Sequence, residues 1–110
     1  MSGVVIRFRY SAWGKFMVVL AVTIRCRKEK VEVANNFFAA FVPRARSESG
    51  CVQYDLFHAK DDPSVFHFFE KWADQESYDL HSRQPYLIEF RARFEELLAE
   101  PNRVLYLLPI

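Results

Sequence analysis

Several features that would place a protein in a familiar class are scarce in this chain of 110 residues. It has two cysteines, Cys26 and Cys51, and their spacing fits neither a disulfide framework nor a metal site. Glycine occurs three times, and the sequence has no Gly-rich phosphate loop and no serine or cysteine nucleophile motif. These absences argue against a disulfide scaffold, a zinc domain, a nucleotide-binding loop and a serine or cysteine hydrolase.

The chain also lacks an excess of charge and a long hydrophobic run. Its formal net charge is +1, which gives no reason to expect a polyanionic partner, so nucleic acid is disfavoured. The longest apolar run covers residues 16–22 and is too short to span a bilayer. Residues 1–16 have no small-residue cleavage site of the kind that ends a signal peptide. We therefore expect a soluble cytoplasmic protein with no membrane partner.

Apolar and aromatic side chains are abundant instead. Apolar residues make up 51% of the chain, aromatic residues 16%, and phenylalanine alone occurs eleven times. The length suits a single domain with a core of moderate size. Because this apolar load exceeds what a small monomer buries easily, it predicts a second buried surface, either a subunit interface or a ligand cavity.

The order of periodic segments predicts the fold class. Two-residue alternation indicates strands near residues 18–26, 51–58, 65–72 and 104–108, and helical spacing indicates helices over residues 31–46 and on both sides of Pro85. Strand, helix, strand, strand, helix pair, strand is the split βαβ order of an α+β ferredoxin-like domain with an antiparallel sheet. We assign this domain to residues 17–110. Residues 1–16 are predicted to be an N-terminal extension, with an extra edge strand as the alternative.

Local signals set the expected element ends. Asp74 stands where a helix N-cap belongs, and Pro85 suits the first position of the last helix. Pro43 removes a backbone donor from the first helix and predicts a kink or break there. Gly50 ends that element and is expected to be free to adopt a positive φ.

The strands near residues 51–58 and 65–72 are expected to form a hairpin, since residues 60–64 have turn chemistry. A register that sets Leu56 opposite Phe68 also sets Tyr54 opposite Glu70.

Both faces of the first and third predicted strands are largely apolar. An antiparallel sheet with helices on one side normally exposes its other face to water, which favours polar residues there. A second copy of the sheet is the simplest cover for a bare apolar face. The pattern therefore predicts a homodimer that packs through its sheet faces.

Three signatures resemble the antibiotic biosynthesis monooxygenase family over residue 17 to the C-terminus. They are Glu48-Ser49-Gly50-Cys51 followed by Tyr54, Glu70-x-Trp72-x-Asp74, and His81 before Tyr86 and Phe90. The resemblance implies a dimeric α/β barrel, close to the small quinol-monooxygenase-like branch. It further implies oxygenation of a small quinol-like or polyphenolic substrate by O₂, with no cofactor and no metal.

The resemblance and the residue chemistry together nominate a site. The candidate catalytic residues are His81, as base or as a group that orients the substrate oxygen, and Glu70, as base or as a hydrogen-bond partner of Tyr54 or of a backbone amide. The structural alternative for His81 is a helix histidine that holds the loop before Pro85. The candidate substrate-binding residues are Trp72, Tyr54, Phe68, Tyr86 and Phe90, and the alternative for Trp72 is a place in the core. A neutral imidazole or a buried carboxylate has the near-neutral pKa that proton removal requires.

Other functions use the same scaffold. An isomerase or degradative enzyme for a small hydroxyketone would need a similar cavity, and a non-catalytic dimeric ligand-binding module is the third possibility. The family also contains haem-degrading enzymes, which use a strand Asn, a Trp and a helical His. This chain has Phe90 at the place of the ligand histidine and no Asn in its first strand, so haem degradation is disfavoured.

Overall fold

A computed structural model describes residues 17–110 of the chain. Four strands form one sheet: β1 (Val18–Arg25), β2 (Cys51–Ala59), β3 (Asp62–Trp72) and β4 (Arg103–Leu107). The helices are η2 (Lys28–Lys30), a 3₁₀ turn, then α2 (Val31–Ala39), α3 (Phe41–Arg46), α4 (Gln75–Ser82), α5 (Pro85–Ala92) and α6 (Phe94–Leu97). The predicted extension over residues 1–16 lies outside the described residues and stays a prediction.

The sheet is antiparallel throughout, with the strand order β2-β3-β1-β4. The predicted hairpin is present, with Tyr54 opposite Glu70 and Leu56 opposite Phe68. β3 begins three residues earlier than the expected strand, at Asp62, because the turn itself is short. This is the α+β ferredoxin-like architecture that the element order predicted.

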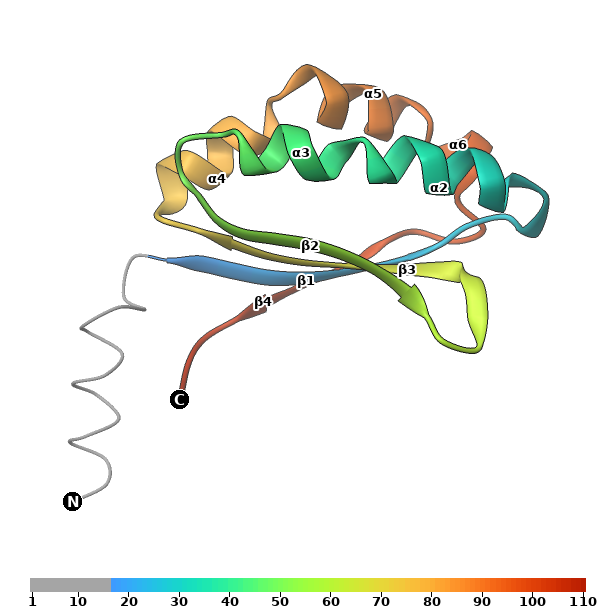
Figure 1. The fold of residues 1–110 in the computed structure, drawn as a ribbon, viewed down its shortest axis with the longest axis horizontal. Coiled ribbons are helices and arrows are strands. Elements are labelled where there is room, and N and C mark those ends of the chain that lie inside the picture. Colours follow the sequence, from blue (N-terminus) through green and yellow to red (C-terminus); the bar gives the residue numbers. More distant parts are fainter. Residues whose placement is uncertain (1–16) are drawn as a thin grey trace.

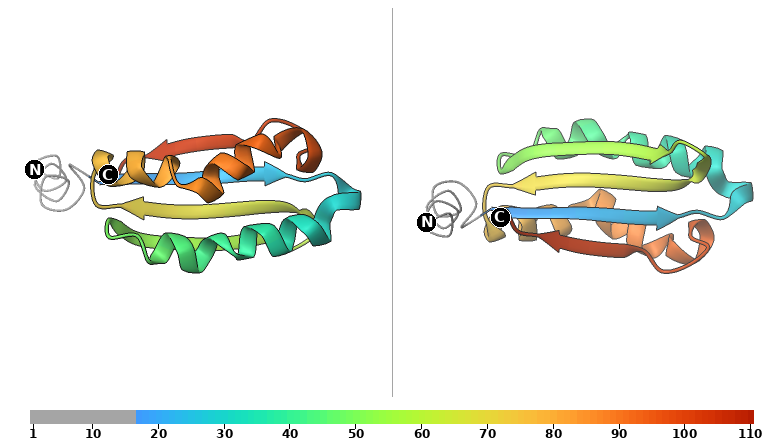
Figure 2. Two further views of the ribbon diagram at one scale, coloured as in Figure 1. Left: turned by 90° about the horizontal axis from the view of Figure 1, so that it is seen from above. Right: turned by 90° about the horizontal axis from the view of Figure 1, so that it is seen from below.

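All helices of residues 17–110 cover the same face of the sheet (Figure 1). Seen from above, α2 and α3 run along β2 and β3, and α4 and α5 run along β3, β1 and β4 (Figure 2, left). The view from below shows the strands with no helix in front of them (Figure 2, right). The core lies between these two layers. Within residues 17–110, no helix is long and apolar enough to cross a membrane.

Phe38 of α2 occupies the centre of this core. Its ring contacts those of Phe41, Phe66, Phe68 and Phe90 at centroid separations between 5.1 and 5.7 Å. All four pairs are edge-to-face, an arrangement that aromatic quadrupoles favour. These phenylalanines therefore pack α2, α3 and α5 against β3.

The first predicted helix is divided, as Pro43 predicted. α2 ends at Ala39 and α3 begins at Phe41, because Pro43 has no N–H to bond the carbonyl of Ala39. The last predicted helix is also divided, which the sequence did not indicate: α5 ends at Ala92, and α6 begins at Phe94.

The end signals of α4 and α5 are confirmed. The Asp74 carboxylate accepts a hydrogen bond from the backbone N–H of Ser77 at 2.8 Å, and Pro85 is the first residue of α5. The expectation for Gly50 is wrong, since no described glycine has a positive φ. Gly50 is required by close packing instead: a Cβ there would lie 2.0 Å from the Ser77 hydroxyl oxygen. The missing side chain lets α4 approach the turn before β2.

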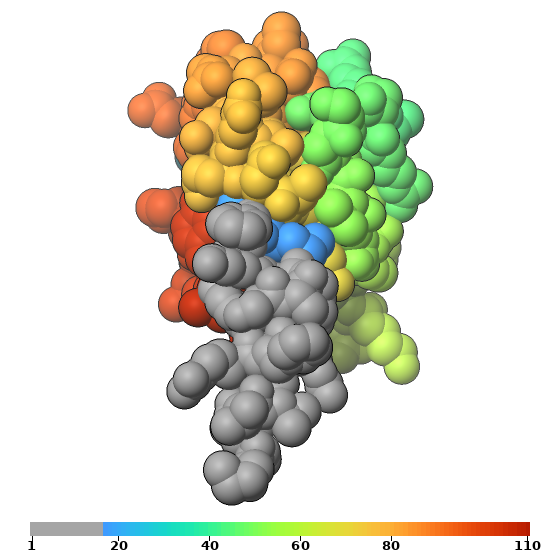
Figure 3. Space-filling view, turned by 90° about the vertical axis from the view of Figure 1, so that its left-hand side faces the viewer, coloured from blue at the N-terminus to red at the C-terminus, as the bar shows by residue number. Residues whose placement is uncertain are grey.

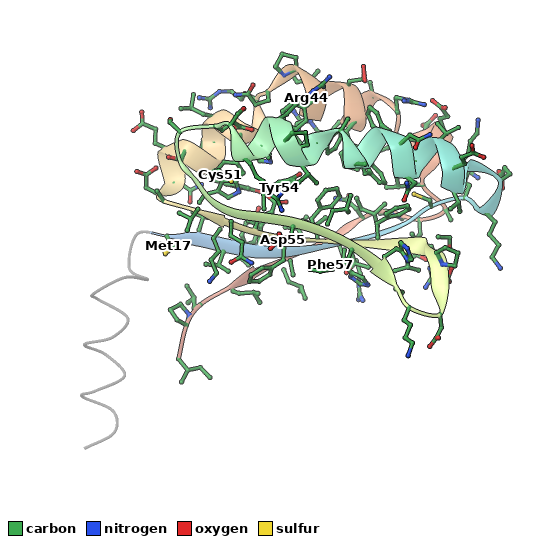
Figure 4. All side chains as sticks on the ribbon, viewed as in Figure 1. Met17, Arg44, Cys51, Tyr54, Asp55 and Phe57 are labelled. Atoms are coloured by element: carbon green, nitrogen blue, oxygen red, sulfur yellow. The ribbon has the colours of Figure 1, made fainter. Side chains whose placement is uncertain are left out.

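The uncovered face of the sheet is apolar but exposed. Phe57 of β2 is 57% exposed and Leu105 of β4 is 61% exposed. Figure 4 shows Tyr54 between the sheet and the helices, and Phe57 on the opposite side of β2. Side chains of a strand alternate between its two faces, so even-numbered Tyr54 lies on the covered face and odd-numbered Phe57 on the exposed face.

Candidate functional site

A cavity of about 160 Å³ lies between the sheet and helices α4 and α5. Its floor is formed by β1, β3 and the start of β4, and its roof by the aromatic residues of α5 and α6. Its polar groups lie in two places. Glu70, His81 and Tyr54 line one part, and Ser82, Arg91 and Asn102 line another. Among the side chains named here, the first three are deeply buried and Arg91 is exposed. We call the first part the inner end and the second part the mouth.

His81 of α4 is the central group of the inner end, and it is 2% exposed. Its ring stacks on the indole of Trp72, with a centroid separation of 4.2 Å and an interplanar angle of 29°. The Nδ1 atom lies 3.0 Å from Oε2 of Glu48, and the Nε2 atom lies 3.5 Å from Oε1 of Glu70. The imidazole is therefore held on one face by an indole and at both edges by carboxyl groups.

Glu70 reaches this position because β3 alternates. Glu70 and Trp72 both point to the helix-covered face, so the Trp72 indole N–H donates to Oε1 of Glu70 at 3.0 Å. The hydrogen-bond partner of Glu70 is therefore Trp72 and not Tyr54. Tyr54 lies opposite Glu70 in the register, with no hydrogen bond to it among the described contacts. Glu70 is 5% exposed, and its burial must be offset by such contacts.

Burial favours the uncharged form of both groups, so it raises the pKa of Glu70 and lowers the pKa of His81. Desolvation raises the pKa of Glu70 to about 7, although the Trp72 hydrogen bond opposes the shift. Desolvation also lowers the pKa of His81, and the neighbouring Glu48 partly restores it. At pH 7 the imidazole is therefore neutral, and Glu70 exists in both protonation states. The inner end therefore holds a neutral imidazole, which is able to accept a proton, beside a carboxyl group whose pKa is about 7.

Three tyrosine hydroxyls surround these groups and remain protonated. Burial raises the pKa of Tyr54, Tyr78 and Tyr86 above the usual value for a phenol. Tyr86 donates to Oε2 of Glu48 at 2.5 Å. Tyr78 lies 2.9 Å from the hydroxyl of Tyr106, which joins α4 to the edge strand β4. These phenols serve as hydrogen-bond donors and as aromatic walls.

The structure brings the seven candidate residues together, but in two groups. Five line the cavity: His81, Glu70, Tyr54, Phe68 and Phe90. Trp72 is fully buried behind His81, and Tyr86 contacts His81 and Glu48 beside the cavity. These two residues support the imidazole and are not part of the cavity wall.

Two residues of the site were not nominated from the sequence. Glu48 lies in the turn between α3 and β2 and contacts His81, which is 33 residues away. Its only signal was its place in the Glu48-Ser49-Gly50-Cys51 signature. Tyr78 lines the cavity one helical turn before His81, a spacing that puts both residues on one side of α4. Within residues 17–110, no group of three or more His, Cys, Asp or Glu side chains has the arrangement of a metal site.

Comparison with known families identifies the architecture. The family model described as antibiotic biosynthesis monooxygenase matches residues 17–93, which is more than half of the chain. The chain belongs to this family. The match covers β1 through α5 and includes every candidate residue of the inner end.

Individual proteins and solved structures are similar to this chain over most of the domain. The Bacillus subtilis protein named "Putative monooxygenase YcnE" is 33% identical over 85 residues, which are 77% of this chain and 90% of that protein. The Synechocystis protein sll1783 is 31% identical over 87 residues, which are 79% of this chain and 59% of that longer protein. The crystal structure of PA3566 from Pseudomonas aeruginosa superposes with a TM-score of 0.80 and 26% identity, over 86% of this chain and 95% of that one.

Proposed function

We propose that this protein is a cofactor-independent monooxygenase that oxidises a small quinol-like or polyphenolic substrate with O₂. The observation that carries the proposal is the position of His81. Its Nε2 atom, on the side of Glu70, lies at the inner end of a cavity whose remaining walls are mostly aromatic and aliphatic. A neutral imidazole there is suited to remove the proton of a phenol.

The proposed chemistry needs only proton transfer and electron transfer. His81 Nε2 takes the phenolic proton, and the resulting phenolate gives one electron to O₂. The substrate radical and superoxide combine to form a C–O bond at a ring carbon that carries hydrogen, and the proton returns from His81 to give a hydroperoxide. Loss of water converts this carbon to a carbonyl, so one oxygen atom enters the product and the other leaves as water. A dry cavity protects the anion during these steps.

The cavity limits the size and polarity of the substrate. Its volume of about 160 Å³ is below the several hundred Å³ typical of drug-sized ligand pockets, which favours a molecule of one or two rings. Phe68 and Phe90 line the cavity with aromatic rings, so a planar substrate ring should pack against them better than a branched chain. A substrate hydroxyl would face Glu70 and His81, and a second polar group would lie near Arg91 and Asn102.

Oxygen consumption tests the proposal. Wild-type protein prepared without metal should consume O₂ with at least one member of a panel of reduced naphthoquinones and polyphenols, and His81→Ala should lower the rate by a factor of about 10² to 10⁴. His58→Ala is the matched control, because His58 is exposed on β2, does not line the cavity, and its ring lies at hydrogen-bond distance from the Ala59 carbonyl. Wild-type protein that consumes no O₂ above the blank with the entire panel would contradict the proposal.

A second function is supported by the pair of proton-transfer groups. Glu70 and His81 lie 3.5 Å apart at one end of the same cavity, and the pKa of Glu70 is raised to about 7. Two such groups are able to move a proton between neighbouring carbons of a small hydroxyketone, which is an isomerase reaction. Anaerobic incubation in D₂O separates the two functions: an isomerase incorporates deuterium into the substrate without O₂, and a monooxygenase gives no product.

We also propose that two copies pair through their uncovered sheet faces. Phe57, Leu105 and the half-buried Phe69 give this face an apolar centre, and an exposed apolar surface of this kind favours association. A two-fold dimer buries the same patch on both copies, so one self-complementary face is sufficient. A monomeric mass by light scattering at micromolar concentration would contradict this pairing.

A further inference from the structure

We propose that Glu48 is the positioning residue of this site: it holds His81 in the tautomer with the proton on Nδ1 and stabilises the imidazolium that forms during the reaction. This inference rests on the proposed function for its kinetic part only. Nothing in the sequence pattern assigned a role to Glu48 beyond a place in a signature. The inference comes from its geometry around the imidazole.

Glu48 and Glu70 contact opposite edges of the same ring. Glu70 lies on the Nε2 side and lines the cavity, whereas Glu48 lies on the Nδ1 side and does not line it. Figure 3 shows the end of the molecule where α4 lies beside the turn before β2. Gly50 lies close to Ser77 of α4, and the backbone N–H of Ala73 donates to the Gly50 carbonyl at 2.8 Å, which joins these two segments. Glu48 is thus fixed behind the imidazole, out of reach of a substrate in the cavity.

The hydrogen bonds at Glu48 determine the tautomer. A carboxylate only accepts hydrogen bonds, so the 3.0 Å contact to Nδ1 of His81 requires a proton on Nδ1. The Tyr86 hydroxyl donates to the same Oε2 atom at 2.5 Å and holds the carboxylate in place. A neutral His81 protonated at Nδ1 has its lone pair on Nε2, the atom that faces Glu70 and the cavity.

Glu48 also lowers the free-energy cost of protonating the buried imidazole. When Nε2 accepts a proton, a positive ring forms at a side chain that is only 3% exposed. Glu48 then provides an opposite charge at hydrogen-bond distance, as the acidic residue does in a Ser-His-Asp triad. The proton stays on Nε2 until it returns to the peroxide, so the step is balanced without a proton donor from solvent.

Other titratable groups face the same ring from each packed element. They are Tyr54 on β2, Glu70 on β3, Tyr78 on α4 and Tyr86 on α5. Cys51 on β2 interacts electrostatically with Glu48 and Glu70. The thiol and phenol pKa values are all raised, so these groups stay neutral near pH 7. Glu70 is the second carboxyl group beside the ring, on its Nε2 side, and the experiment must therefore separate Glu48 from Glu70.

Nitrogen NMR of the imidazole tests the tautomer without any substrate. In wild-type protein labelled with ¹⁵N-histidine, His81 should carry its proton on Nδ1 at pH 7 to 8. Glu48→Gln should lower the pKa of His81 and lose the single Nδ1–H tautomer, because an amide both donates and accepts. Glu70→Gln should keep the Nδ1–H tautomer. A wild-type His81 protonated at Nε2 would overturn the inference, and this measurement needs no variant to fold.

Steady-state kinetics, with a substrate that the wild-type protein oxidises, test whether Glu48 stabilises the imidazolium. Glu48→Gln should lower kcat by a factor of about 10² to 10⁴ and leave KM nearly unchanged, with the acid limb of the pH profile moved to lower pH. Glu89→Gln changes an exposed carboxyl on α5 and should leave both constants unchanged. Tyr86→Phe should cost only a few fold, since it removes a support of Glu48 and not its charge. If the wild type turns over substrate and Glu48→Gln has the same kcat, the role of Glu48 is refuted and the proposed function stands. If the wild type shows no turnover, the proposed function itself is refuted.

Discussion

On the helix-covered face of the sheet, Phe66, Phe68 and Trp72 of β3 are each at most 3% exposed. On the other face, Phe57 of β2 and Leu105 of β4 are each more than half exposed. Both faces are rich in large apolar side chains, so apolar character alone does not distinguish them. The difference is that only the covered face holds buried polar groups, which are stabilised by the aromatic residues and hydrogen bonds around them. The covered face forms the site, and the open face remains available for another surface.

The largest expected effect is in the centre of the covered face. Phe38→Ala should lower the free energy of unfolding by about 3 to 5 kcal/mol, because the ring contacts five others and is fully buried. Denaturant unfolding followed by circular dichroism measures the change. Ile88→Ala on the exposed side of α5 is the control and should stay within about 0.5 kcal/mol. Equal losses for the two variants would show that the two layers are not packed as described.

The second effect concerns the buried carboxyl of the covered face. The pKa of Glu70 is raised from 4.5 to about 7, so the folded state binds its proton more tightly than the unfolded state. Its protonation therefore stabilises the fold at pH values below the unfolded pKa, and this contribution is lost as the pH rises through about 7. Glu70→Gln should remove a pH-dependent loss on the order of 3 kcal/mol between pH 4.5 and 7.5.

Unfolding titrations at several pH values, on wild type and Glu70→Gln, measure this difference. Asp55→Asn is the control, because Asp55 projects from the opposite face of β2 and forms an ion pair with Arg46. A wild-type stability that follows the same pH curve as Glu70→Gln would mean that Glu70 is not perturbed by burial.

The third effect tests how closely the helical layer approaches the sheet. Gly50→Ala places a methyl group against the Cβ and hydroxyl of Ser77 and should cost about 1 to 3 kcal/mol through overpacking. The same variant with Ser77→Gly should recover most of the loss, because the obstructing side chain is gone. The melting temperatures of wild type, Gly50→Ala and the double variant give the comparison. No loss in Gly50→Ala would mean that α4 does not lie against the turn.

The smallest effect is expected on the open face. Phe57→Asp places a charge in the proposed interface of both copies, and the dimer dissociation constant should rise at least tenfold, about 1.4 kcal/mol. Sedimentation velocity over a concentration series measures it. Ile88→Asp has a similar exposure, 54% against 57%, but lies on the helical layer and should not change the constant. A Phe57→Asp protein that dimerises like wild type would move the interface to another surface.

Much of the fold was predictable because it depends on neighbouring residues. The two-residue period of β3 gives the shared face of Glu70 and Trp72, and Asp74 and Pro85 begin their helices through their own side-chain chemistry. The break after Ala92 was not predictable, because the apolar stripe continues through it. The role of Gly50 was misjudged, because its reason is a contact with Ser77 and not its own backbone angle.

The sequence by itself determined the order of the elements, the alternation of the strands and the family to which the chain belongs, since these follow from local spacing and short signatures. Only the tertiary structure decided that Glu48 lies behind His81 and that Trp72 supports this ring without lining the cavity. The physical reason is that such contacts join residues on separate elements. Their distances are set by how closely the helical layer packs on the sheet, which no local pattern encodes.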